Sequence, residues 1–205
     1  MPNFKHIPIR SQQEIDNQHF TSPYSLCTFS RVIPSKGIKE AIDAVKQVNE
    51  QLHKTVFVLD IWGVIEDKKW FNQLMKSQPK YIQYKGTTPS NLSVDTLQHY
   101  YLLLFPTYYE GEGLAGTILD SMAAGLPVIT TEWHNNSDII QNAFNGYLTQ
   151  IKDSQSIANI LLHLAKSDAE LYNLRKNCLC VATQYAPHQI INDFFSTIEY
   201  KITNN

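Results

Sequence analysis

Two basic side chains stand five residues apart at a place where the sequence predicts the start of a helix. Arg31 and Lys36 lie between an apolar run that ends at Phe29 and a helical pattern that begins at Ile38. Positive charge is unfavourable at a helix N-terminus, whereas an anion there meets free backbone N–H groups. Arg offers phosphate oxygens a planar fork, and Lys offers them a mobile point charge. The pair therefore predicts a bound polyanion such as a diphosphate, with two solvated loop residues as the alternative.

A second loop, from Pro106 to Thr117, combines glycines with acidic side chains ahead of another predicted helix. Its glycines, which permit close backbone approach to a ligand, are Gly111, Gly113 and Gly116. Glu112 and Asp120 are eight residues apart, so one carboxylate before the helix and one inside it can border the same cleft. The alternative is a dipole-favoured N-terminal acid with an exposed helical Asp. The loop matches neither the P-loop nor the G-x-G-x-x-G pattern, so alone it indicates a ligand site only weakly.

The elements that must position these loops follow from alternating apolar runs and helical patterns. Strands are predicted at 26–29, 55–61, 81–84, 101–105 and 128–131, and helices at 38–48, 66–76, 94–99 and 116–124. This alternation predicts an α/β fold, a Rossmann-like doubly wound parallel sheet with helices on both faces. Beyond residue 148 the chain is predicted to continue as C-terminal helices, at 154–166, 169–183 and 187–200. Both candidate loops then follow strands at their carboxyl ends, where such sheets bind ligands.

Composition limits the class of protein. The 205 residues are 43% apolar and 18% charged, with a net charge of −2, which is typical of one globular domain. Residues 1–23 are polar and aperiodic and are predicted to be a linker or extended lead-in, with the ordered domain at 24–205. Short apolar runs, no signal peptide and scattered Lys and Arg predict a soluble cytoplasmic protein that binds no nucleic acid. The three Cys lack a zinc-binding spacing, so no metal site is expected.

Taken together, these segments resemble the nucleotide-binding half of a GT-B fold, specifically that of the retaining glycosyltransferases of group 1, also called GT4. Residues 31–37, RVIPSKG, resemble the family's Arg-x-x-x-x-Lys-Gly segment. Residues 112–129, EGLAGTILDSMAAGLPVI, resemble its signature of two Glu separated by seven residues, followed by a Gly-x-Pro-Val turn and strand. Glu110 does not fit this signature, because Ile118 lies eight residues after it. Pro2-Asn3-Phe4 resembles the interdomain linker, so the resemblance covers nearly the whole chain.

The resemblance implies a role for each matched residue. Arg31 and Lys36 grip the donor diphosphate and stabilise the charge that develops on it as the glycosidic bond breaks. Glu112 faces the donor sugar and completes the expected catalytic set. Asp120 takes the place of the second Glu, which contacts the ribose, but is one methylene shorter, so this contact is expected to be longer, water-bridged or absent. The other expected substrate-binding residues are Gly113, Leu114, Ala115, Gly116 and Thr117.

Two further segments belong to the same expected cleft. Residues 85–87 occupy the loop where the family often meets the nucleobase, and nothing in them distinguishes uracil from guanine. Trp62 follows a strand toward the cleft and is expected either to pack in the core or to line the cleft. Because Arg31 and Lys36 stand in for a metal ion, no cofactor is expected beside the nucleoside-diphosphate sugar.

The resemblance implies the donor-binding domain of a hexosyltransferase-type enzyme, which transfers a sugar from a nucleoside-diphosphate sugar to a saccharide or lipid-linked acceptor. The acceptor-binding N-terminal half is missing from this sequence, so we expect it as a partner in cis or in trans. No turnover is expected from this chain alone. Association with the inner face of the membrane is expected only through that missing half. Two alternatives stay open: a non-catalytic or split nucleotide-sugar-binding subunit, and a GT-B sugar-nucleotide epimerase.

Overall fold

The strand order of the sheet determines where the loops meet. The computed structural model describes residues 7–186, 189, 191 and 195, so the helix predicted over 187–200 lies almost entirely outside the described residues. All strand pairs are parallel, and their order is β3-β2-β1-β4-β5-β6. The strands are β1 (Tyr24–Phe29), β2 (Phe57–Trp62), β3 (Ile82–Gly86), β4 (Leu102–Phe105), β5 (Val128–Thr131) and β6 (Gly146–Thr149). The predicted Rossmann-like parallel sheet is confirmed.

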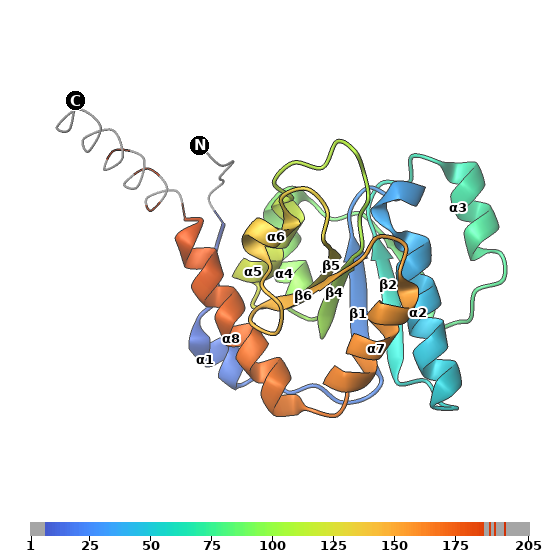
Figure 1. The fold of residues 1–205 in the computed structure, drawn as a ribbon, viewed down its shortest axis with the longest axis horizontal. Helices are drawn as coiled ribbons and strands as arrows, with labels where there is room; N and C mark the ends of the chain where they lie inside the picture. Colours follow the sequence, from blue (N-terminus) through green and yellow to red (C-terminus); the bar gives the residue numbers. More distant parts are fainter. Residues whose placement is uncertain (1–6, 187–188, 190, 192–194, 196–205) are drawn as a thin grey trace.

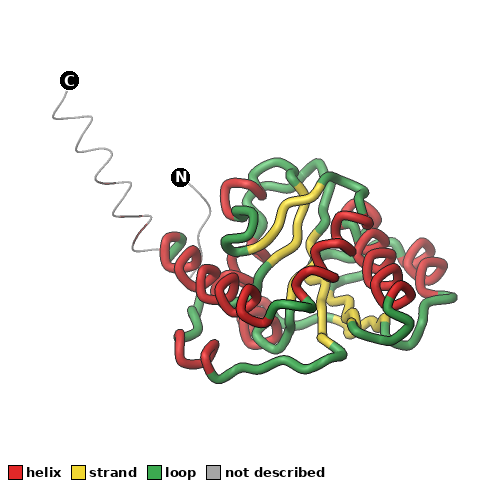
Figure 2. Tube along the Cα trace, turned by 60° about the horizontal axis from the view of Figure 1, so that its bottom comes forward, coloured by secondary structure: helices red, strands yellow, loops and turns green. Residues whose placement is uncertain are grey.

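Helices cover both faces of this sheet (Figures 1 and 2). The apolar cluster on one face includes residues of α2, α3 and α7, and the cluster on the other includes residues of α4 and α5. Helix α8 contributes to both clusters, and α1 packs on α8. The helices are α1 (Gln12–Asp16), α2 (Ile38–Gln51), α3 (Lys68–Met75), α4 (Ser93–Leu97), α5 (Gly116–Ala123), α6 (Asn136–Ile139), α7 (Ser154–Leu164) and α8 (Asp168–Gln184), with 3₁₀ turns η1 (Pro34–Lys36) and η2 (Ser90–Leu92). Such double cover is what a parallel sheet requires.

The central strand β4 shows how the apolar pattern fixes the sheet. All four of its residues are buried, with Leu102 and Leu104 in the cluster that includes α2 and α7, and Leu103 and Phe105 in the cluster that includes α5. Successive side chains of a strand point to opposite faces. Each such side chain contributes about 1.5–3 kcal/mol on burial. The unbroken apolar run therefore holds β4 in the middle of the sheet and fixes where its following loop begins.

Several short elements differ from the sequence expectation: helices α1 and α6, strand β6 and the two 3₁₀ turns were not predicted. Helix α1 lies within the segment 1–23, where an extended lead-in was predicted; Ser11 and Glu14 form a capping box at its start, and Ile15 is 1% exposed. The extended conformation is wrong there, because a five-residue helix is too short to show a helical period. Strand β6 was not predicted, because Gly146 weakens its short apolar run. A Cβ at Gly146 would overlap the Val128 carbonyl oxygen, so the close strand pairing requires glycine.

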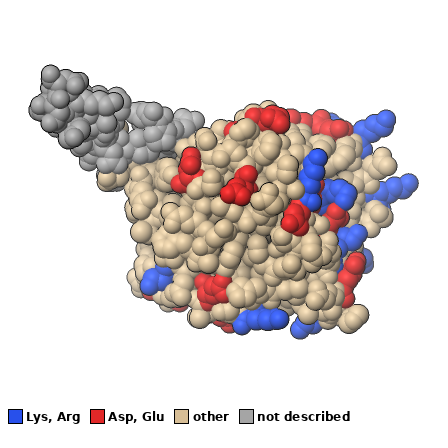
Figure 3. Space-filling view, viewed as in Figure 1, with Lys and Arg blue, Asp and Glu red and all other residues tan. Residues whose placement is uncertain are grey.

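One face of the molecule carries mixed charge. On the face shown in Figure 3, Lys and Arg side chains lie among Asp and Glu side chains. Nucleic-acid binding generally uses a basic stripe, and the face in Figure 3 shows none. Among the helices that the structure describes, none is long and apolar enough to cross a membrane.

Strands β1 and β4 pair with each other at the centre of the sheet, and the chain leaves them toward opposite faces. After β1 it runs through η1 into α2, whereas after β4 it runs into α5 on the other face. Diverging connections of this kind open a crevice at the carboxyl ends of the two strands, and doubly wound sheets bind ligands in it. In Figure 1 these loops lie at the upper end of the sheet.

Candidate functional site

Lys36 and Glu112 form a buried ion pair at the edge where β1 and β4 end. Lys36 is the last residue of η1, and Glu112 lies in the loop between β4 and α5. The Lys36 ammonium contacts Glu112 Oε2, and the two side chains are 7% and 9% exposed. The Thr107 hydroxyl donates to the same carboxylate oxygen at 2.8 Å. Because a buried charge is tolerated only when it is paired and hydrogen-bonded, each side chain supports the position of the other.

Glycine makes this close approach possible. Gly37 follows Lys36 with a φ of 72°, a left-handed conformation that favours glycine. A Cβ at Gly37 would overlap the Pro106 carbonyl oxygen, so the start of α2 packs directly on the backbone of the loop after β4. The Tyr108 backbone N–H donates to the Ser35 carbonyl at 2.8 Å and holds the same contact. The Lys-Gly step of the sequence therefore places Lys36 opposite the acidic loop.

Arg31 lies next to this pair and nearer to solvent, with its side chain 45% exposed. Its Nη1 donates to both carboxylate oxygens of Glu66, at 3.2 and 3.4 Å. Its Cζ lies 4.7 Å from the centroid of the Tyr109 ring, and Lys36 Nζ lies 4.9 Å from the same centroid. Hydrogen bonding to Tyr109, and then to Glu66, raises the pKa of Arg31 above its usual value. The two predicted phosphate-binding cations therefore meet at one aromatic ring.

A pocket of about 220 Å³ opens beside Arg31. It joins the loops after β1, β2 and β3 to the first turn of α5. Its lining residues are Phe29, Ser30, Arg31, Trp62, Gly63, Val64, Thr87, Thr88 and Thr117. Trp62 thus lines the cleft, as one of its two sequence interpretations has it. Of the expected substrate-binding residues, Thr117 shares this pocket with Arg31, and so does Thr87 from the predicted nucleobase loop.

A chain of hydrogen bonds holds Trp62 in the pocket wall. Its Nε1 donates to the Tyr100 hydroxyl at 2.7 Å, and that hydroxyl donates to Asp60 Oδ2 at 2.9 Å. Lys85 Nζ lies 3.7 Å from the same carboxylate oxygen. Burial raises the pKa of Tyr100, so the phenol stays protonated and continues to donate. Asp60 and Tyr100 therefore support the wall from behind.

The start of α5 presents backbone at this edge. The helix begins at Gly116 with Ala115 as its N-cap, and no side chain caps its first N–H groups, which leaves them to other acceptors. A Cβ at Gly113 or Gly116 would meet no atom within 4 Å. Packing within the described chain therefore does not require glycine at these two positions, and the missing side chains leave room for a ligand. Ala115 is buried and Leu114 packs on the cluster around α5, so these two can meet a ligand through backbone groups.

Asp120 lies one turn further along α5, in a different hollow. It is 4% exposed and lines a pocket of about 420 Å³ together with Ile7, Pro8, Ser90, Asn91, Ser93 and Val94. The structure therefore brings Arg31, Lys36 and Glu112 together at one edge of the sheet. It places Asp120 in a separate hollow that Arg31 does not line.

Sequence reasoning missed Glu66 and Tyr109, the two partners of Arg31. Glu66 follows β2 and Tyr109 follows β4, so both stand in loops at the carboxyl edge of the sheet. That placement was the available signal, but neither residue has a diagnostic spacing. With Glu66 included, each cation has its own acidic partner: Arg31 pairs with Glu66, and Lys36 pairs with Glu112. Within the part of the chain that the structure describes, no three His, Cys, Asp or Glu side chains gather to hold a metal ion.

Curated relatives match this chain over part of their length. The GtfA subunit of the UDP-N-acetylglucosamine–peptide N-acetylglucosaminyltransferase of Streptococcus pneumoniae is 26% identical over 97% of this chain and 40% of its own length. The UDP-Gal:α-D-GlcNAc-diphosphoundecaprenol α-1,3-galactosyltransferase of Escherichia coli is 27% identical over 72% of this chain and 38% of its own length. The chain therefore spans about 40% of the length of these relatives.

Solved structures share the fold. Pneumococcal GtfA in complex with UDP and GlcNAc has a TM-score of 0.73 at 24% identity, over 96% of this chain and 38% of that one. The C-terminal domain of the group 1 glycosyl transferase LpcC from Francisella tularensis has a TM-score of 0.69 at 24% identity, over 87% of this chain and 94% of that one. Among known families, the one described as "Glycosyl transferases group 1" matches residues 10–179. Because this match covers most of the chain, the protein belongs to the glycosyl transferases of group 1.

Proposed function

We propose that this chain is the donor-binding half of a retaining glycosyltransferase. Its donor is a UDP-sugar, and its acceptor is a saccharide or a lipid-linked glycan. The observation that carries the proposal is the meeting of Arg31, Lys36 and Glu112 at one edge of the sheet. That edge is where doubly wound sheets bind their ligands.

The two cations retain N–H donors for a diphosphate. A Lys ammonium has three N–H donors and an Arg guanidinium has five; Lys36 contacts Glu112, and Arg31 Nη1 contacts Glu66. Negative charge grows on the diphosphate as the bond to the anomeric carbon breaks. Cations fixed at the site of that charge stabilise it more than they stabilise the intact donor. With two cations in this role, we propose that transfer needs no essential metal ion.

Glu112 retains one carboxylate oxygen that could accept a hydrogen bond from the proposed donor sugar. Lys36 and Thr107 both contact Oε2, and within the described residues Oε1 has no hydrogen bond. An ionised carboxylate accepts at both oxygens, so Oε1 is the atom that a sugar hydroxyl would meet. A fixed carboxylate also stabilises the positive charge that develops on the sugar ring during transfer. Glu112 would therefore act on the sugar, while the cations act on the leaving group.

The choice of a uridine nucleotide is supported by the relatives. The names of both curated relatives give UDP-linked donors, and the GtfA structure contains UDP. In this chain, Arg31 forms part of the wall of the 220 Å³ pocket that Trp62 and Thr87 also line. A nucleoside attached to a diphosphate at Arg31 can extend into that pocket. The indole face of Trp62 suits a flat, apolar part of the nucleoside.

Transfer requires an acceptor-binding half as well. The chain spans about 40% of the curated relatives, and we propose that an acceptor-binding domain joins it in cis or in trans. Half of a cleft cannot hold two reactants at near-attack distance. Nucleotide binding, rather than turnover, is therefore the measurement that this chain supports.

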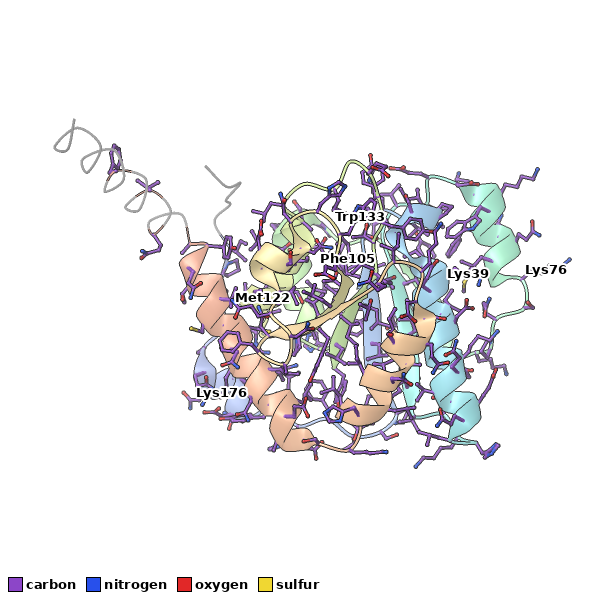
Figure 4. The ribbon with its side chains drawn as sticks, viewed as in Figure 1. Lys39, Lys76, Phe105, Met122, Trp133 and Lys176 are labelled. Atoms are coloured by element: carbon purple, nitrogen blue, oxygen red, sulfur yellow. The ribbon has the colours of Figure 1, made fainter. Side chains whose placement is uncertain are left out.

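The test is a calorimetric titration of UDP into the 205-residue chain and into its Arg31→Ala and Lys76→Ala variants. Lys76 is exposed just after α3, at the right edge of the molecule in Figure 4, and does not line the pocket beside Arg31, so it controls for the loss of one positive charge. We expect Arg31→Ala to bind UDP at least about tenfold more weakly, because charge-assisted hydrogen bonds to phosphate are lost. Lys76→Ala should bind as the wild type does. Unchanged affinity in Arg31→Ala contradicts the diphosphate role.

A further inference from the structure

One aromatic ring faces both of the cations that would hold the diphosphate. Arg31 Cζ lies 4.7 Å and Lys36 Nζ 4.9 Å from the centroid of the Tyr109 ring. The distance between the two cations therefore cannot exceed the sum of those two distances. Arg and Lys cations are attracted to the electron-rich face of an aromatic ring. Tyr109 thus offers a shared attractive surface to two like charges that repel each other.

The surrounding loops hold Tyr109 in this position. Its backbone N–H donates to the Thr107 hydroxyl at 3.3 Å, and the Trp133 indole N–H donates to its carbonyl at 3.0 Å. Trp133 stands in the loop after β5, at the same end of the sheet as Phe105 at the end of β4 (Figure 4). A Cβ at Gly111 would lie 2.8 Å from the Tyr109 ring, so glycine at that position leaves space for the ring. The backbone and the ring are therefore both fixed by the loop structure.

A diphosphate makes the spacing of the cations important. A monophosphate can be held by one cation, whereas two linked phosphates are held best when two cations stand at a matching distance. Glu66 anchors Arg31, and Glu112 anchors Lys36, each from a different loop. The Tyr109 ring is the element that contacts both cations at once.

We propose that Tyr109 is a positioning residue that sets the spacing of Arg31 and Lys36 for the two phosphates of the donor. The inference depends on the proposed donor-binding function and adds a specific determinant of diphosphate recognition to it. Tyr109 acts through the two cations. Its removal should therefore weaken the binding of a nucleoside diphosphate more than that of a nucleoside monophosphate.

The experiment compares UDP with UMP in calorimetric titrations of the full chain. The variants are Tyr109→Leu, which removes the ring, and Tyr109→Phe, which keeps it. Tyr108→Leu is the matched control, because the Tyr108 ring lies 5.1 Å from Lys152 and has no such contact with Arg31 or Lys36. We expect Tyr109→Leu to lose roughly tenfold in UDP affinity and less than about threefold in UMP affinity. Tyr108→Leu should keep the wild-type ratio of the two affinities. Tyr109→Phe keeps the ring but loses the hydroxyl that bonds Arg31, so its ratio should lie closer to that of the wild type than to that of Tyr109→Leu.

The ratio of UDP to UMP affinity separates positioning from a general structural role. Equal losses for both nucleotides, or no loss in Tyr109→Leu, overturn the inference while leaving donor binding by the wild type intact. Absence of UDP binding in the wild type overturns the proposed function instead, and the inference with it. Should Tyr109→Leu fail to fold, Tyr109→Gln carries the same test, since it also removes the ring and places a polar end at a partly exposed position.

Discussion

The Lys36–Glu112 pair allows a quantitative test of how the site holds charge. We consider Lys36→Met, Glu112→Gln and the double variant. Each single change leaves the other charge at a position that is more than nine-tenths buried. Removing one partner of a buried pair costs about 3–5 kcal/mol of the free energy of unfolding. Thr107 still bonds Glu112, and the Phe105 and Tyr109 rings still face Lys36, so we expect roughly 2–3 kcal/mol for each single variant.

The double variant leaves no charge behind, so its cost should be well below the sum of the two single costs. We expect a coupling free energy of at least about 1.5 kcal/mol. The measurement is urea unfolding at pH 7 of the wild type, the two single variants and the double variant, which together form a double-mutant cycle. The comparison requires that the slope of the unfolding free energy against urea concentration is the same for all four proteins. Single-variant costs that add to within about 0.5 kcal/mol would refute the reasoning, because independent sites add in that way.

The chain offers a matched control for this cycle. Lys39 and Asp43 form an ion pair one turn apart on α2, with side chains 60% and 33% exposed. An exposed helical pair of this kind couples by only about 0.3–0.5 kcal/mol. Lys39→Met with Asp43→Asn should therefore give a much smaller coupling than the buried cycle. A similar coupling in both cycles would show that burial does not set the strength of the Lys36–Glu112 pair.

Three further variants test the supporting structure. Gly37→Ala should lose at least about 2 kcal/mol in urea unfolding, because φ is 72° and the new Cβ overlaps the Pro106 carbonyl. Gly86→Ala, at φ 89° in open space, should lose only about 1 kcal/mol, and equal losses would contradict the packing argument. Asp153→Ala removes the N-cap of α7 and should cost about 1 kcal/mol at pH 7. Hydrogen bonds from Ser156 lower the pKa of Asp153. The stabilisation by this cap is therefore fully present above the ordinary Asp pKa and is lost as the pH falls through the lowered pKa. A stability difference between the wild type and Asp153→Ala that stays constant down to pH 3 contradicts this expectation.

Local patterns predicted most of the fold. The 3.6-residue period of α2 and the apolar run of β4 are strong signals, because burial of a whole helix or strand face imposes them. Helix α1 and strand β6 have only five and four residues, too few for a period to emerge. The Ser11-x-x-Glu14 cap was nevertheless visible in the sequence, and it was the one local signal for α1.

The grouping of the candidate site residues was predicted in part, for a related reason. Arg31 and Lys36 stood out because positive charge before a helix is unfavourable. Glu112 stood out because it lies among more glycines than the local structure needs. Tyr109 and Glu66 have ordinary loop positions, and their importance arises only when the sheet brings the loops after β1, β2 and β4 together. Sequence spacing within one loop carries no information about such contacts between loops.

The pairing of each cation with its own acid determines how the edge meets an anion. Arg31 with Glu66, and Lys36 with Glu112, form two nearly neutral pairs. Charges that cancel within a few ångströms produce little field at a distance, particularly in the presence of salt. Long-range attraction therefore contributes little to the capture of an anion, including the proposed donor, at this edge. Under the proposed function, selectivity arises on contact, where the ammonium and guanidinium still have N–H donors to offer. The spacing of the two cations is then the property that distinguishes one anion from another.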